Sequence, residues 1–133
     1  MRYLLDTDIC SYIRRKHPPK VLAHMERVDA GTLGISVITY GELSHGATRS
    51  VDAKRSLSDL ERFIALIPVL PLPEAAGAAY GHVRAVLSDR GGLIGPNDLW
   101  IASHALAAGL VLVTNNEREF RRVSGLAVEN WSK

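Results

Sequence analysis

Short apolar runs alternate with longer segments of helical periodicity along this chain, and that alternation limits the fold more than any other feature. Strands are predicted at residues 3–5, 33–35, 69–70, 110–113 and 126–128. Helices are predicted at residues 7–15, 19–28, 36–47, 52–66, 74–89, 96–108 and 116–121. Because strands separated by helices need crossover connections, we expect an α/β fold: an α/β/α sandwich around a central, mainly parallel sheet of four to five strands.

The size and composition of the chain suit one ordinary globular domain. We expect a single domain over residues 1–133, because 47% hydrophobic and 23% charged residues allow a full apolar core. The one cysteine, Cys10, cannot form an intramolecular disulfide, and a free thiol fits a reducing compartment. No apolar stretch has the length of a membrane span, and the early Asp6 does not fit a signal peptide. We therefore expect a cytoplasmic protein.

The charge balance alone does not identify a partner. The formal net charge is only +2. Basic residues nevertheless gather in three places that could neutralise phosphates: residues 14–16 with Lys20, Arg49 with residues 54–55, and Arg118 with residues 121–122. For any one of these clusters, a solvated helix end is the better explanation.

Three acidic residues stand at positions where chemistry is possible, although each also has an ordinary explanation. Asp6 follows the first strand and could simply cap the next helix. Glu42 lies within a helix, where surface glutamates are common. Asp98 lies in the first turn of a helix, where the helix dipole favours an acid and is expected to keep it ionised.

The combination of these acids is more informative than any one of them. Asp98 shares a helix face with Ala102, Ala105 and Gly109, which is small enough to pack against the sheet. Active sites of such folds lie beyond the carboxyl ends of the strands, where Asp6 also falls. Carboxylates that converge there repel one another unless a cation intervenes. A hard divalent cation in such a pocket supports phosphodiester hydrolysis.

Other catalytic patterns are absent from the sequence. The five histidines show no zinc-binding spacing, and His45 and His104 are expected to be packed or partly exposed helix residues. Residues 91–95 lack the lysine of a phosphate-binding loop, and no G-x-S-x-G nucleophile motif occurs. Cys10 has no evident histidine partner and is expected in the core.

Four segments, in order, resemble the motifs of PIN domains, and in particular of VapC toxins from bacterial toxin–antitoxin pairs. They are residues 4–10 (LLDTDIC), 38–43 (ITYGEL), 95–102 (GPNDLWIA) and 112–120 (LVTNNEREF), and the C-terminal residues 123–131 also look like the end of a VapC toxin. This resemblance implies a PIN-like α/β/α sandwich and an endoribonuclease that depends on Mg²⁺ or Mn²⁺. It also implies inhibition by a VapB-type antitoxin and a homodimer.

The same resemblance assigns roles to individual residues. Asp6, Glu42 and Asp98 fall on the acidic positions that hold the metal. In many relatives the fourth acid stands at the position of Asn116, and in others at the position of Glu119. We select Glu119 as the fourth catalytic residue. Three residues are expected to support the site from behind the ligands, and Asp8 to cap or support it without ligating. These three supporting residues are Thr7, Thr114 and Asn116.

The resemblance to VapC toxins also suggests a substrate, and two other functions remain open. The segments Thr114–Asn116 and Gly95–Asp98 resemble those of VapC toxins that cut transfer RNA, notably initiator tRNA at the anticodon stem-loop. A catalytically silent module that binds RNA or a partner is one alternative, because Asn116 occupies a sometimes acidic position. An aspartyl-phosphate phosphatase with Asp6 as nucleophile and Asp8 as general acid is another.

Overall fold

A computed structural model describes residues 1–133, and five strands form its single sheet. The strands are β1 (Tyr3–Leu5), β2 (Leu33–Ser36), β3 (Val69–Leu70), β4 (Val111–Val113) and β5 (Val128–Glu129). They lie in the order β3-β2-β1-β4-β5, and every neighbouring pair is parallel. The predicted parallel sheet is therefore confirmed, with β3 between its prolines at one edge.

Seven α-helices connect the strands, and most of them begin at local sequence signals. The side chains of Asp6, Ser36 and Asp52 each accept a hydrogen bond from a backbone N–H in the first turn of the following helix. The helices are α1 (Thr7–Arg15), α2 (Pro19–Glu26), α3 (Val37–Thr48), α4 (Ala53–Leu66), α5 (Ala75–Asp89), α6 (Pro96–Ala108) and α7 (Glu117–Phe120), with a 3-10 turn, η1, at Ala30–Thr32.

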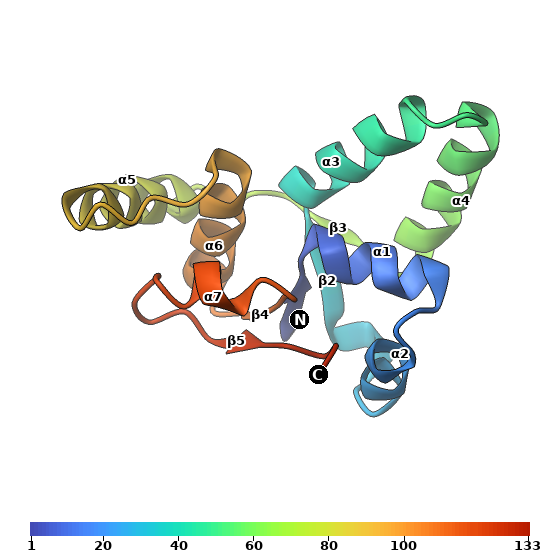
Figure 1. The fold of residues 1–133 in the computed structure, drawn as a ribbon, viewed down its shortest axis with the longest axis horizontal. Coiled ribbons are helices and arrows are strands. Elements are labelled where there is room, and N and C mark those ends of the chain that lie inside the picture. Colours follow the sequence, from blue (N-terminus) through green and yellow to red (C-terminus); the bar gives the residue numbers. More distant parts are fainter.

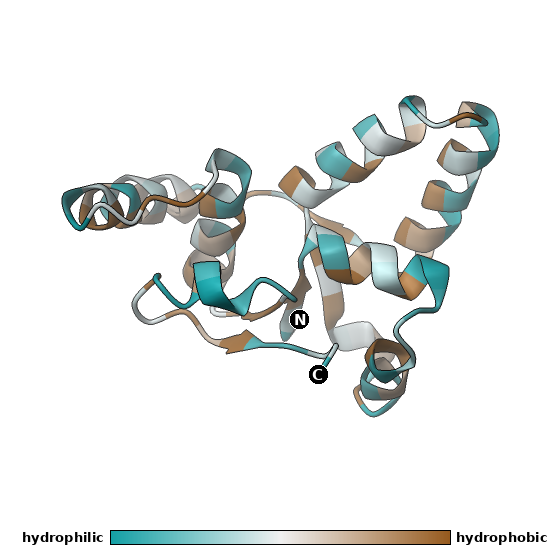
Figure 2. Ribbon diagram, in the orientation of Figure 1, coloured by the Kyte–Doolittle hydropathy of each residue, from teal (hydrophilic) through white to brown (hydrophobic).

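The helices pack on both faces of the sheet, as Figure 1 shows, which confirms the α/β/α sandwich. Side chains of α1 to α4 form one apolar cluster with Tyr3, Leu5 and Ile35, and Cys10 lies within it as expected. Side chains of α5, α6 and α7 form a second cluster with Leu4 and Leu112. Figure 2 shows the apolar residues along the strands and in stripes on the helices. No helix has both the length and the apolar character needed to cross a membrane.

The last strand begins two residues later than predicted and ends one residue later. The apolar run at residues 126–128 suggested a strand there, but Val128 pairs with Leu112 and Glu129 with Val113. The chain still turns at Gly125, which has a positive φ of 82°, and the Leu126 N–H donates to the Val123 carbonyl at 3.4 Å. This turn keeps Leu126 out of the ladder, so the hydrophobic run predicted the strand too early.

Candidate active site

The carboxyl ends of three neighbouring strands meet at one crevice of the sheet. Asp6 follows β1, Ser36 ends β2, and Thr114 follows β4. The strand order reverses at β1, because the chain continues to β2 on one side while β4 lies on the other. Ligands of open α/β sheets bind at this kind of reversal point. In Figure 1 the first turns of α1, α3 and α6 surround this position.

Asp6 lies at the centre of this crevice and is held through both carboxylate oxygens. Its Oδ1 accepts the Thr7 backbone N–H at 2.7 Å, and its Oδ2 accepts the Thr114 hydroxyl at 2.7 Å. The side chain is buried, and this desolvation is the main cause that raises the pKa of Asp6 from 3.8 to about 6. The charges of Asp8 and Glu42 add to the rise, while the two hydrogen bonds oppose it.

Glu42 reaches the same crevice from α3 and is tied to Asp6 through Thr7. The Thr7 hydroxyl donates to Oε1 of Glu42 at 2.6 Å, while the Thr7 backbone N–H bonds Asp6. One residue therefore sets the position of both acids. The hydroxyl of Thr39 lies 3.4 Å from the Thr7 hydroxyl. Thr39 was not predicted as a site residue, although its place one helical turn before Glu42 puts both on the same face of α3.

Asp98 approaches from the first turn of α6, and its ionisation differs from the expectation. The helix dipole was expected to keep this half-buried carboxyl charged. Instead, its pKa is raised from 3.8 to about 7, first by desolvation and then by the negative charges of Asp6, Glu119 and Glu42. A side-chain hydrogen bond with Glu119 raises it further. The prediction was wrong for the metal-free protein because desolvation, together with acids from three other chain segments, outweighs a dipole effect of about 0.3–1 kcal/mol.

Glu119 and Asn116, the two candidates for the fourth position, lie in one hydrogen-bonded group. The Asn116 side-chain amide donates to Oε2 of Glu119, and the Gly95 backbone N–H donates to Oε1 at 3.1 Å. The Asn116 backbone N–H donates to the Thr114 hydroxyl oxygen at 3.0 Å. Glu119 is thus the acid that faces Asp98, and Asn116 links it to the residues behind Asp6.

The four acids have no cationic partner in the protein. The ion pairs within 4.0 Å involve only Glu129, Asp59 and Glu117. A cluster of mutually repelling carboxylates without a lysine or arginine is the environment that a bound cation relieves. Carboxylate oxygens without histidine or cysteine suit a hard cation such as Mg²⁺ rather than zinc.

The spacing of the acids bears on how such an ion would be held. No three side chains of histidine, cysteine, aspartate or glutamate lie close enough together to ligate one ion directly. Mg²⁺ usually keeps several of its waters and takes only one or two carboxylates from the protein. The donor set therefore fits a hydrated divalent cation. Asp8 is exposed in the first turn of α1, its charge adds to the raised pKa of Asp6, and its supporting role stays a prediction.

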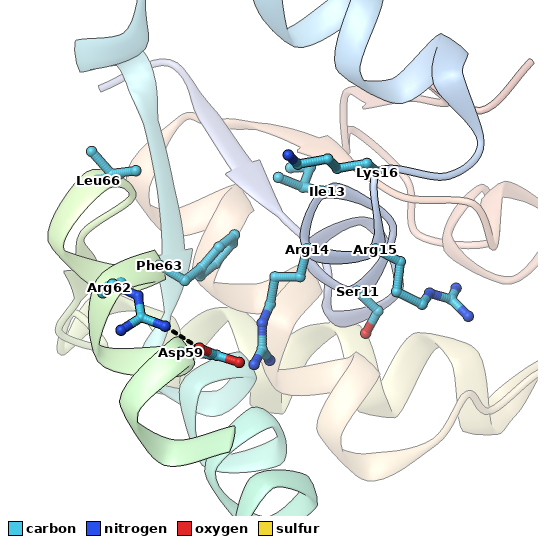
Figure 3. A pocket seen from close by; sticks show the side chains of 9 residues that line it. All are labelled: Ser11, Ile13, Arg14, Arg15, Lys16, Asp59, Arg62, Phe63 and Leu66. Carbon is cyan, nitrogen blue, oxygen red and sulfur yellow. Dashed lines mark hydrogen bonds and ion pairs between the residues drawn. The ribbon is translucent and has the colours of Figure 1, made fainter. Parts of the chain in front are cut away.

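A separate basic groove lies between α1 and α4, away from these acids. Figure 3 shows Arg14 of α1 directed toward Asp59 and Arg62 of α4, which pair with each other. Arg15 and Lys16, at the end of α1, also line the groove, although their side chains do not point toward Arg62. Three apolar side chains, Ile13, Phe63 and Leu66, also line the groove. None of the four acids lines this groove. The first basic cluster of the sequence is therefore a surface feature distinct from the acidic crevice.

Comparison with known proteins shows which family this chain belongs to. The family model described as "PIN domain" matches residues 3–126. The chain belongs to the PIN-domain family. Nucleases of this PIN-domain family generally depend on divalent metals, in agreement with the acidic crevice.

Curated relatives place the chain more narrowly within the PIN family. It is 40% identical to "Ribonuclease VapC2" of Haemophilus influenzae over 131 residues, which cover 98% of each chain. It is also 40% identical to "tRNA(fMet)-specific endonuclease VapC" of Shigella flexneri over 132 residues, 99% of each chain. Among solved structures, VapBC-1 from nontypeable Haemophilus influenzae matches with a TM-score of 0.93 at 36% identity, covering 100% of both chains. The chain is therefore a PIN-domain ribonuclease of the VapC type.

Proposed function

We propose that this chain is an Mg²⁺- or Mn²⁺-dependent endoribonuclease toxin whose cation is held by Asp6, Glu42 and Asp98. Glu119 is the fourth catalytic acid, and residues 1–133 act as one domain. The observation that carries this proposal is the convergence of four carboxylates, without a basic partner, beyond the carboxyl ends of β1 and β4. The positions of these acids on four separate segments of a PIN-domain chain support it.

A bound divalent cation supplies an activated water and stabilises negative charge on a phosphoryl oxygen. The residues around the crevice hold the carboxylates in position for the cation that would perform these two roles. Thr7 and Thr114 occupy one lone pair on each Asp6 oxygen, so the remaining lone pairs stay available on a fixed carboxylate. Thr7 likewise fixes Glu42 through one oxygen only. Glu119 is oriented by Gly95 and Asn116, beside Asp98, where it can accept a proton from an attacking water.

The substrate that we propose is transfer RNA. The Shigella flexneri relative, named as a tRNA(fMet)-specific endonuclease, is 40% identical over nearly the full length of both chains. We extend that name to this chain and propose initiator tRNA, cut in the anticodon stem-loop. An unpaired loop suits sequence-specific recognition, because its bases can be splayed out and read. Since tRNA is its substrate, the enzyme acts in the cytoplasm.

The partner that we propose is a VapB-type antitoxin, bound to a homodimer of this chain. The structural relative from Haemophilus influenzae is a VapBC complex, and it matches this chain along its whole length. The surface offers a place for such a partner, because the groove between α1 and α4 continues into a second, largely apolar groove lined by Met25, Val28 and Ile67. Leu66 borders both grooves and is 79% exposed.

A catalytically silent RNA-binding module is the second candidate, and one observation favours it. An amide, Asn116, stands at a position that the resemblance to VapC toxins gives as sometimes acidic, and its side chain donates to Glu119. Such a module would bind RNA equally well with and without a chelator. An enzyme would cut only when the metal is present.

The deciding experiment maps new 5′ ends of cellular RNA after brief expression of the wild type and of Asp98→Asn. We expect one dominant class of new ends, in tRNA, with the wild type and none with Asp98→Asn. The matched control is Asp89→Asn, an exposed aspartate at the end of α5, which should give the wild-type pattern. Equal cleavage by purified Asp98→Asn and wild type would refute the assignment.

A further inference from the structure

A buried histidine connects the two helices that carry Glu42 and Asp98. His104 lies in α6 and is 1% exposed, and its Nδ1 lies 2.9 Å from the Ser36 hydroxyl, 68 residues away in the chain. Ser36 ends β2 and caps α3, with its Oγ accepting the Ile38 backbone N–H at 3.1 Å. The hydroxyl proton of Ser36 is therefore free to be donated to the unprotonated Nδ1 of His104.

The protonation state of His104 agrees with this arrangement. Burial lowers its pKa below the usual value, so the ring is neutral at physiological pH and one ring nitrogen is an acceptor. A neutral ring in a packed interior has few alternative partners. The bond between His104 and Ser36 is thus a fixed link between the cap of α3 and the middle of α6.

The position of this link relates it to the acids. Glu42 lies six residues after Ser36 on α3, and Asp98 lies six residues before His104 on α6. These two acids come from opposite sides of the crevice, and each belongs to a helix that the link holds. Their charges interact directly, since Glu42 contributes to the raised pKa of Asp98. Carboxylates that repel each other push their helices apart unless something holds the helices together.

We propose that His104, through Ser36, is a positioning residue that sets the separation of Glu42 and Asp98 so that both face one divalent cation. This inference rests on the proposed function. His104 touches neither the cation nor the RNA. It acts by keeping α3 and α6 in register before the metal binds, when the repulsion between the acids is not yet neutralised.

A residue that only packs the core and a positioning residue differ in one measurable respect. Loss of packing lowers stability but leaves the cation affinity of the folded protein unchanged. Loss of the link allows Glu42 and Asp98 to separate, so the affinity for the cation falls as well. Changes to residues behind metal ligands lower metal affinity by about 10–100-fold. Because His104 acts through a helix, we expect its replacement to lower the cation affinity by about tenfold, the lower end of this range.

The experiment measures Mn²⁺ binding to the full-length protein by electron paramagnetic resonance, together with its Tm. His104→Leu replaces the ring with an apolar side chain and removes the link. His104→Asn keeps an acceptor near the position of Nδ1 and should restore part of the affinity. Ser36→Gly removes the hydroxyl but keeps a residue that is favourable at a helix N-cap, so it serves if His104→Leu does not fold.

The matched control is Ser103→Ala. Ser103 is the neighbouring buried polar residue of α6, but its hydroxyl bonds the Leu99 carbonyl within the same helix at 2.7 Å. We expect about tenfold weaker Mn²⁺ binding with His104→Leu and Ser36→Gly, partial recovery with His104→Asn, and wild-type affinity with Ser103→Ala. Wild-type affinity in His104→Leu, or an equal loss in Ser103→Ala, would overturn the inference. Failure of the wild type to bind Mn²⁺ would instead count against the proposed function itself.

Discussion

The Thr114 hydroxyl donates a hydrogen bond to Oδ2 of Asp6 at 2.7 Å, although 108 positions separate the two residues in the sequence. The bond is buried and joins the residue that follows β4 to the residue that follows β1. The Thr114 hydroxyl oxygen also accepts a hydrogen bond from the backbone N–H of Asn116, and the side-chain amide of Asn116 donates to Glu119. One threonine therefore connects Asp6, the central acid of the crevice, to Asn116 and through it to Glu119.

The first prediction concerns that bond. Thr114→Val keeps the shape of the side chain but removes the donor to Asp6 and the acceptor for Asn116. We expect about tenfold weaker Mn²⁺ binding and a corresponding loss of RNA cleavage at low metal concentration, because hydrogen bonds orient metal ligands. Titration of cleavage with Mn²⁺ checks this. Thr114→Ser retains the hydroxyl and should remain close to the wild type; equal loss in both variants would show that the hydroxyl is not responsible.

The second prediction concerns the stability of the metal-free protein. Asp98→Asn removes a carboxyl that is partly desolvated and surrounded by other acids, while the amide can still donate to Glu119. We expect the metal-free variant to be more stable than the wild type at pH 8 by about 1 kcal/mol, allowing for solvent screening of a half-buried group. The corresponding rise in Tm is about 3 °C. A lower Tm than the wild type in the presence of chelator would contradict this account.

The third prediction follows from the pKa values of Asp6 and Asp98, about 6 and about 7 against an ordinary value of 3.8. Between pH 4 and 7, the folded state binds more protons at these groups than the unfolded state, so their contribution to stability falls as pH rises. Other groups also titrate, so the informative quantity is the Tm difference between the wild type and Asp98→Asn. In chelator, this difference should be small at pH 5 and larger at pH 8.

Divalent metal should offset the loss of stability that ionisation of Asp6 and Asp98 causes at higher pH. Ligation requires ionised carboxylates, so added Mg²⁺ should raise the Tm of the wild type more at pH 8 than at pH 5. It should have little effect on Asp98→Asn. An Mg²⁺-induced Tm rise that is the same at both pH values would contradict the role of these acids as ligands.

The fourth prediction tests the groove between α1 and α4 as the antitoxin surface. Leu66→Asp places a charge on a residue that is 79% exposed and borders both the basic groove and the apolar groove beside it. We expect at least tenfold weaker binding of the VapB-type antitoxin, because one desolvated charge costs more than about 1.4 kcal/mol. RNA cleavage by the free toxin should be unchanged. Isothermal titration calorimetry with the purified antitoxin checks the first result.

Leu57→Asp is the control for this surface. Leu57 lies on the same helix and is 39% exposed, but it lines neither groove. The Leu57→Asp variant should bind the antitoxin as tightly as the wild type does. Unchanged binding by Leu66→Asp would place the partner elsewhere on the molecule.

Most of the fold could be predicted because its boundaries depend on local signals. Asp6 and Ser36 cap helices in the structure as the sequence indicated, and Gly109 ends α6 in the left-handed conformation. The last strand was displaced because pairing with β4, together with the turn at Gly125, decides where it begins. A hydrophobic run indicates which residues are buried, but here it did not indicate the register in which two strands pair.

The candidate site was less predictable, because its chemistry depends on contacts between distant segments. The sequence placed Asp6, Glu42, Asp98 and Glu119 near one edge of the sheet, but it gave the wrong ionisation for Asp98. That error arose because the burial that raises its pKa most, and the acids that add to the rise, depend on how distant segments pack together. The link from His104 to Ser36 was also invisible, since a lone histidine in a helix carries no pattern. Residue types could be selected from sequence, whereas their pairings required the structure.

The central claim is that Asp6, Glu42 and Asp98 share one divalent cation. Anomalous diffraction from a crystal soaked in Mn²⁺ tests this most directly. The account predicts a manganese peak in the crevice beyond the carboxyl ends of β1 and β4, within ligand distance of at least one of these carboxylates and bridged by water to the others. A crystal with full Mn²⁺ exposure that shows no peak there, or shows these acids directed to separate surfaces, would contradict it.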